Sequence, residues 1–111
     1  MEEDPFDIQL DELDHACLDL TGKLERLHKA ILHIRHLREQ GRPVSEIVAF
    51  GPGVPARREV RDSWSGLNRA LHTYRVRLVK SMVDDEGMSI ADAARVTHNA
   101  RQVVSRLYHG A

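Results

Sequence analysis

Apolar residues in the first third of the chain recur at alternating steps of three and four. This pattern continues over four heptads, which is typical of a long helix in a coiled coil or helical hairpin. It predicts a helix from about Phe6 to Gln40, roughly 50 Å long at 1.5 Å per residue. We expect two chains to dimerise through its a and d positions, which are Leu10, Leu13, Cys17, Leu20, Leu24, Leu27, Ile31 and Ile34.

The g positions widen this apolar stripe, since they include Ala16, Ala30 and Leu37. A stripe wider than a two-stranded seam favours packing against more than one helix. The pattern does not decide between a parallel and an antiparallel coil. Cys17 at an a position is interpreted as a small core residue, with a redox bridge across a parallel dimer as the alternative.

Glycine and proline then interrupt the helical pattern. Gly41 is expected to end the first helix in a left-handed conformation, and Pro43 prevents its continuation. The segment 44–50 is expected to form one short amphipathic helix whose apolar residues Val44, Ile47, Val48 and Phe50 pack on the long helices.

A second long helical segment is expected to open at Pro55 and to end near Asp84–Gly87. The stretch 63–66 contains a glycine that is expected to kink or divide it. Two long amphipathic helices joined by a break fold most simply as an antiparallel hairpin. The predicted fold class is therefore all-α, with residues 1–54 as the N-terminal coiled-coil part and 55–111 as the C-terminal part.

The last quarter of the chain predicts two short helices joined by a tight turn. Ser89 is placed to cap the first helix, with Asp92 three residues later, and Asn99 to cap the second, with Gln102 three residues later.

In the second of these helices the apolar and polar residues separate onto opposite faces. Val104 and Leu107 are expected to point inward, where Leu78, Val79 and Met82 at the end of the preceding helix are expected to cover both of them and also Ala93 of the first short helix. The opposite face carries Arg101, Gln102, Ser105 and Arg106, a set of donor-rich side chains that suits the major groove of DNA.

Residues 89–108 resemble the helix-turn-helix core shared by Cro- and FIS-type regulators, resolvases and region 4 of sigma factors. The resemblance rests on the small residue Ala94 in the first helix and on the apolar Val104 and Leu107 in the second. Two residues depart from the pattern. His98 stands where glycine is usual in the left-handed turn, and Asn99 replaces the usual buried aliphatic residue.

The resemblance implies that Ala100, Arg101, Gln102, Ser105 and Arg106 occupy the base-reading positions. Arginine matches guanine edges and glutamine matches adenine edges. Gln102 cannot reach a base if its side chain folds back to cap Asn99. The residues expected to face phosphate or to be structural are Ser89, Arg95, Asn99, His109, Arg77 and Lys80.

Charge is unevenly distributed along the chain. Residues 1–20 contain no Lys or Arg and eight acids, which are Glu2, Glu3, Asp4, Asp7, Asp11, Glu12, Asp14 and Asp19. The rest of the chain carries 16 basic and 9 acidic groups, which suits a body that meets a polyanion. Arginines of the second long segment are expected to contact phosphate or, alternatively, the acidic helix of a neighbouring chain.

Composition excludes several classes of function. There is no phosphate-binding loop, no nucleophile motif and no paired carboxylates on an apolar face, so an enzyme and a cofactor are not expected. His33 and His36 lack the further ligands that a metal site needs. No apolar run is long enough for a membrane span, and with one cysteine and 13 arginines against 3 lysines we expect a bacterial, cytoplasmic, nucleoid-associated protein.

These observations predict a dimeric regulator of transcription that binds duplex DNA. The alternative is a coiled-coil interaction module that binds a transcription component such as a sigma factor, since helix-turn-helix folds also hold protein.

Overall fold

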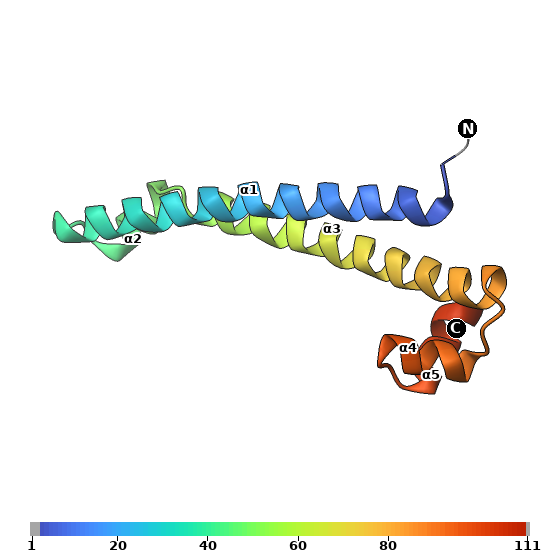
Figure 1. Ribbon diagram of the computed structural model, residues 1–111. Coiled ribbons are helices and arrows are strands. Elements are labelled where there is room, and N and C mark those ends of the chain that lie inside the picture. Colours follow the sequence, from blue (N-terminus) through green and yellow to red (C-terminus); the bar gives the residue numbers. More distant parts are fainter. Residues whose placement is uncertain (1–2, 111) are drawn as a thin grey trace. The chain divides into compact units, whose positions relative to one another are not determined.

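The computed structural model describes residues 3–110, so Glu2 of the acidic segment lies outside it. Within this range the chain is all-helical, with no strand, as predicted. Figure 1 shows the helices in chain order from α1 in blue to α5 in red. Their bounds are α1 Pro5–Glu39, α2 Val44–Phe50, α3 Gly53–Lys80, α4 Ile90–Thr97 and α5 Arg101–His109, with a π-helical turn η1 at Ser81–Asp85 after α3.

Both ends of α1 follow from local chemistry. At its start Asp4 accepts a hydrogen bond from the backbone N–H of Phe6 at 2.8 Å, which satisfies one of the open amides of the first turn. At its end Gly41 has φ 81°, and the N–H of Arg42 donates to the carbonyl of Leu37 at 3.1 Å. The prediction of a left-handed glycine that ends this helix is confirmed.

The short helix α2 forms at the predicted residues, but its predicted packing is wrong. Only Ile47 is buried, whereas Val44 and Val48 are more than half exposed and Phe50 is 88% exposed. A helix of seven residues buries a single stripe, and here that stripe is one residue wide. The other apolar side chains of α2 face solvent.

The predicted division of the second long segment is wrong, whereas the alternative of a kink within a continuous helix stays a prediction. Helix α3 begins at Gly53, two residues before Pro55, and continues without a break through 63–66. Ser63 is buried, and its hydroxyl donates a hydrogen bond to Asp19 of α1. The small side chain of Ser63 thus serves the contact with α1 and does not mark a division of the helix.

The chain forms two compact units that interleave in sequence. One unit is Asp14–Asn68, and the other combines the N-terminal residues through Leu13 with the chain from Arg69 onward. The predicted domains, residues 1–54 and 55–111, are two consecutive segments of the chain, and this division stays a prediction.

In the unit Asp14–Asn68, α1 and α3 pack against each other in opposite directions. Asp19 bonds Ser63, Arg26 pairs with Glu59 at 3.4 Å, and later in α1 the side chain of Ile34 lies beside Gly53. Successive contacts advance along α1 and retreat along α3, which defines an antiparallel pair. In the other unit, the rings of Phe6 and Tyr74 lie 5.7 Å apart.

The α1 residues predicted for dimerisation divide into two rows. The d positions Leu13, Leu20, Leu27 and Ile34 are buried or half-buried, whereas the a positions Leu10, Cys17, Leu24 and Ile31 are exposed. The inward face is completed by g positions, among which Ala30 is only 4% exposed. The chain therefore buries its own d and g rows and leaves the a row in solvent. Cys17 is accordingly not a core residue of the single chain.

No helix within residues 3–110 combines the length and the apolar character needed to cross a lipid bilayer.

Candidate nucleic-acid interface

Helix α4 begins at the predicted cap. Ser89 has extended backbone angles, and its Oγ accepts a hydrogen bond from the backbone N–H of Asp92 at 3.0 Å. This bond satisfies one of the open amides of the first turn. Asp92 in turn forms an ion pair with Arg95 on the exposed side of the helix. The prediction of a Ser89 cap is confirmed.

The turn after α4 is closed by backbone hydrogen bonds. His98 is left-handed, with φ 56° and ψ 35°, as the sequence predicts. Its N–H donates to the carbonyl of Arg95 at 3.3 Å, and the N–H of Asn99 donates to the carbonyl of Ala94 at 3.0 Å. These two bonds form a Schellman motif, in which a left-handed residue satisfies the last carbonyls of a helix.

The predicted Asn99 cap of the second helix is wrong. Because the backbone of Asn99 closes α4, the next helix starts one residue later, and Ala100 occupies its N-cap position with no side-chain bond. Within the described residues no protein group accepts a hydrogen bond from the N–H of Arg101 or Gln102. The conflict between capping and base contact at Gln102 disappears, because its side chain does not fold back onto Asn99.

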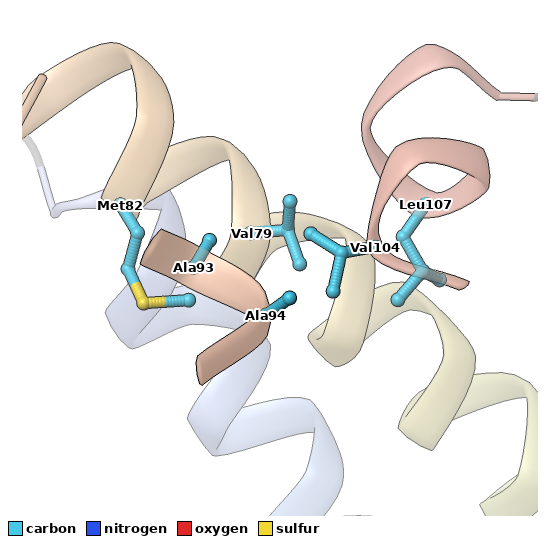
Figure 2. Close-up of a cluster of buried hydrophobic side chains, with 6 residues drawn as sticks. All are labelled: Val79, Met82, Ala93, Ala94, Val104 and Leu107. Carbon is cyan, nitrogen blue, oxygen red and sulfur yellow. The ribbon is translucent and has the colours of Figure 1, made fainter. Parts of the chain in front are cut away.

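Helix α5 is strongly two-sided. Val104 is fully buried and Leu107 is 7% exposed, and both belong to a core shared with α4 and the end of α3. Figure 2 shows the six buried side chains of this core meeting from three directions: Val79, Met82, Ala93, Ala94, Val104 and Leu107. The predicted cover by Val79 and Met82 is confirmed, and Leu78 is half-buried against the same core. This packing determines which face of α5 points outward.

The start and the outward face of α5 bring together four of the five residues predicted to occupy base-reading positions, whereas the fifth, Ala100, is the N-cap residue of the helix. Arg101, Gln102, Ser105 and Arg106 line one open depression on the surface. Ser105 is half-buried and the other three are exposed. The two guanidinium groups and the Gln102 amide together carry twelve N–H donors, five for each arginine and two for the amide. Within the described residues, none of these donors bonds to a protein acceptor.

A second depression adjoins the first and shares Arg101 with it. It is lined by Ala91, Ala94, Arg95, His98, Asn99 and Arg101, from α4, the turn and the start of α5. Of the residues predicted to face phosphate, Arg95 and Asn99 therefore lie beside the α5 face. The region from Met88 to Gly110 contains three arginines and one aspartate, so this surface is net positive.

The remaining predicted residues do not line these depressions. Ser89 is occupied as the cap of α4. Arg77 and Lys80 are half-buried in the last turn of α3. The ring of His109 lies 4.9 Å from that of Tyr108 in an edge-to-face arrangement.

One contact that supports α5 was not predicted. The Tyr108 hydroxyl donates a hydrogen bond of 2.7 Å to Asp84 Oδ1 in η1, 24 residues earlier. This bond and the negative charge of Asp84 raise the pKa of Tyr108, because both favour the protonated phenol. Only the burial of Leu107 and the phase of α5 could have drawn attention to Tyr108, and nothing local points to Asp84 as its partner.

The arrangement offers charge and hydrogen-bond donors. Among residues 3–110, no three His, Cys, Asp or Glu side chains are grouped so that they could hold a metal ion. A helix face with arginine, glutamine and serine suits recognition of a large polar surface. Comparison with protein-family models, with curated proteins and with solved structures finds no match to this chain.

Proposed function

We propose that α4, the turn at 98–100 and α5 form a helix-turn-helix that binds duplex DNA, carried by a dimer of helical hairpins. The observation that carries the proposal is the outward face of α5. Arg101, Gln102, Ser105 and Arg106 line one depression, and the last three of them lie at least about 100° around the helix from the buried Val104. Side chains of these types supply the donors that contact guanine, adenine and phosphate.

The uncapped start of α5 supports the same proposal. The amides of Arg101 and Gln102 have no protein acceptor, and the N-terminus of a helix carries a partial positive charge. A phosphate group satisfies both amides where a cap residue is absent. In this arrangement the start of α5 sits against the DNA backbone, while Gln102 and Arg106 reach into the major groove.

As a regulator, the protein would control transcription by steric or architectural effects at the DNA sites that it occupies. Phosphate contacts supply most of the affinity, and the α5 face supplies sequence preference. A two-fold dimer presents two such faces and so prefers palindromic sites. The half-site spacing that binds best then reports the distance between the two reading helices.

The test is fluorescence anisotropy with a labelled random duplex across roughly 50–200 mM salt, a range in which several phosphate contacts strongly weaken binding. We expect salt-dependent binding of the wild type and a loss of at least about tenfold in the Arg101→Ala/Arg106→Ala variant, because each lost phosphate or base contact costs about 1 kcal/mol or more. The matched control is Arg58→Ala/Arg69→Ala, which removes the same charge from exposed positions of α3. Equal weakening by both variants, or no binding at low salt, would refute the proposal.

A second candidate function is favoured by α2. Phe50, Val44 and Val48 expose apolar surface next to each other in sequence, and such a patch suits a protein partner. In this alternative the helical hairpin binds a transcription component such as a sigma factor, with the exposed side chains of α2 in the contact. A partner whose capture survives nuclease treatment and is lost in Phe50→Ser would favour it over DNA binding.

A further inference from the structure

The antiparallel pair of α1 and α3 in the unit Asp14–Asn68 leaves a row of apolar side chains in solvent. Leu24 is 47% exposed, Ile31 is 45% exposed and Trp64 of α3 is 55% exposed, and Cys17 is exposed in the same heptad position as Leu24 and Ile31. Trp64 is the only tryptophan in the chain. We name these four residues the apolar row.

Helix geometry places the apolar row on one side of the pair. A residue turns the helix by about 100°, so the a row lies about 90° around α1 from the middle of the buried d and g rows. Trp64 follows the buried Ser63 and lies about 100° from it around α3, in the same rotational sense. In two antiparallel helices, equal turns in the same sense away from the contact lead to the same side.

The opposite side of the pair is polar. It holds the ion pair between Arg26 and Glu59 and the bond from Ser63 to Asp19. A pair of helices with one polar and one apolar side is half of a four-helix arrangement, because the apolar side is buried only when another pair covers it. The charges beside the apolar row indicate which partner covers it.

The charges that flank the a row change sign along α1. The neighbouring e row carries the acids Asp7 and Asp14 in its first half, and the base Arg35 with the hydrogen-bond donor His28 in its second half, with Thr21 between them. If a second α1 lies antiparallel with Thr21 opposite Thr21, Asp14 meets His28 and Asp7 meets Arg35. Each pair occurs twice in a two-fold dimer, and no like charges in the row are opposed.

The same register matches the apolar residues. It brings Cys17 to within one residue of the level of Leu24 in the other copy, and it places both tryptophans near the two-fold axis, because Ser63, which precedes Trp64, is bonded to Asp19 of the same chain. Buried tryptophan near the centre of an interface is a frequent source of binding energy. An interface whose charges and apolar residues both match their own reversed copy is what a two-fold homodimer requires.

We propose that the apolar row is the homodimer interface, covered by a second copy of this chain with its α1 antiparallel and Thr21 at the two-fold axis. The two rows of the predicted seam thus pack in different contacts: the d row packs within one chain and the a row packs between chains. This inference deepens the dimeric part of the proposed function and is tested without DNA, so that either can fail alone.

The first test is sedimentation equilibrium of the full chain with Leu24→Glu against Leu18→Glu. Both leucines are exposed in α1, Leu18 by 61%, but Leu18 lies on the side of the helix away from α3 and from the apolar row. We expect Leu24→Glu to raise the dimer dissociation constant at least about tenfold, since it removes two buried leucines per dimer, and Leu18→Glu to leave it unchanged. Far-UV circular dichroism establishes that both variants remain helical.

The second test reads the register through Cys17. In the proposed register, Cys17 and its copy are eight residues apart along antiparallel helices, roughly 12 Å, which exceeds the Cα separation of about 7 Å that a disulfide tolerates. Oxidation of the wild type therefore yields no covalent dimer, whereas Leu24→Cys yields one through Cys17. Adding Cys17→Ser to Leu24→Cys abolishes that dimer.

Four results would overturn the proposal. The first is a wild-type monomer at about 100 µM, where standard interfaces are populated, and the second is equal weakening of the dimer by Leu18→Glu and Leu24→Glu. The third is a covalent dimer of the oxidised wild type, which indicates parallel helices, and the fourth is a disulfide between two chains that joins Cys17 to the new thiol of Trp64→Cys but not to that of Leu24→Cys. The last result would place α1 against α3 of the second copy.

Discussion

Replacement of His98 by glycine tests how much strain the turn between α4 and α5 stores. His98 has φ 56° and ψ 35°, a region in which a Cβ atom approaches the following carbonyl oxygen and costs about 1–2 kcal/mol. Glycine removes that cost but loses about 0.5–1 kcal/mol more backbone entropy on folding. The His98 side chain is exposed, so no buried contact is lost. We therefore expect His98→Gly to raise the free energy of unfolding by about 0.5–1 kcal/mol.

Hydrogen exchange of the Val104 and Leu107 amides measures this change in the unit that contains the turn. A stabilisation of about 0.5–1 kcal/mol slows their exchange by about two- to fivefold. The control is His98→Ala, which removes the imidazole and keeps the Cβ atom, and which leaves exchange unchanged within about twofold. Faster exchange in His98→Gly, or equal slowing in both variants, would show that the left-handed backbone is not the source of strain.

Two further predictions concern the support of α5. Val104→Ala lowers the free energy of unfolding by about 2–3 kcal/mol, because it removes two buried methyl groups and leaves a cavity. The control Val96→Ala, at a 56% exposed position, changes it by less than about 0.5 kcal/mol. Urea denaturation measures both values, and similar losses in the two variants would contradict the burial of Val104. Because the pKa of Tyr108 is raised, its bond to Asp84 stabilises the fold below about pH 10, and this stabilisation is lost as the pH rises through the raised pKa. We therefore expect the difference in the free energy of unfolding between wild type and Tyr108→Phe to be constant near neutral pH and to fall in alkali. A difference that grows in alkali would mean that the phenolate is the favoured form.

Much of the helical structure could be predicted because its signals are local. Gly41 ends α1 where a left-handed residue and a following proline permit no further turn. Ser89 begins α4 because a hydroxyl at that position reaches an amide three residues ahead. The bounds of α2 agree with the prediction, and those of α1 differ from it by one residue at each end.

The candidate site was predictable in part. The periodicity of α5 separates Gln102 and Arg106 from Val104, and the structure places both in one depression with Arg101 and Ser105. The N-cap of α5 was predicted wrongly because Asn99 can either cap α5 with its side chain or close α4 with its backbone, and in the structure its N–H closes α4. The bond from Tyr108 to Asp84 was missed because it joins residues far apart in the chain.

The sequence by itself determined that α1 is a long helix with an apolar stripe, because hydrophobic spacing follows the helical repeat. It could not determine which part of that stripe is covered, because a, d and g positions are apolar alike. Only the tertiary structure decided this. The antiparallel approach of α3 buries Leu20 and Ala30 and turns Leu24 and Ile31 to solvent, since one neighbouring helix covers only part of a wide stripe.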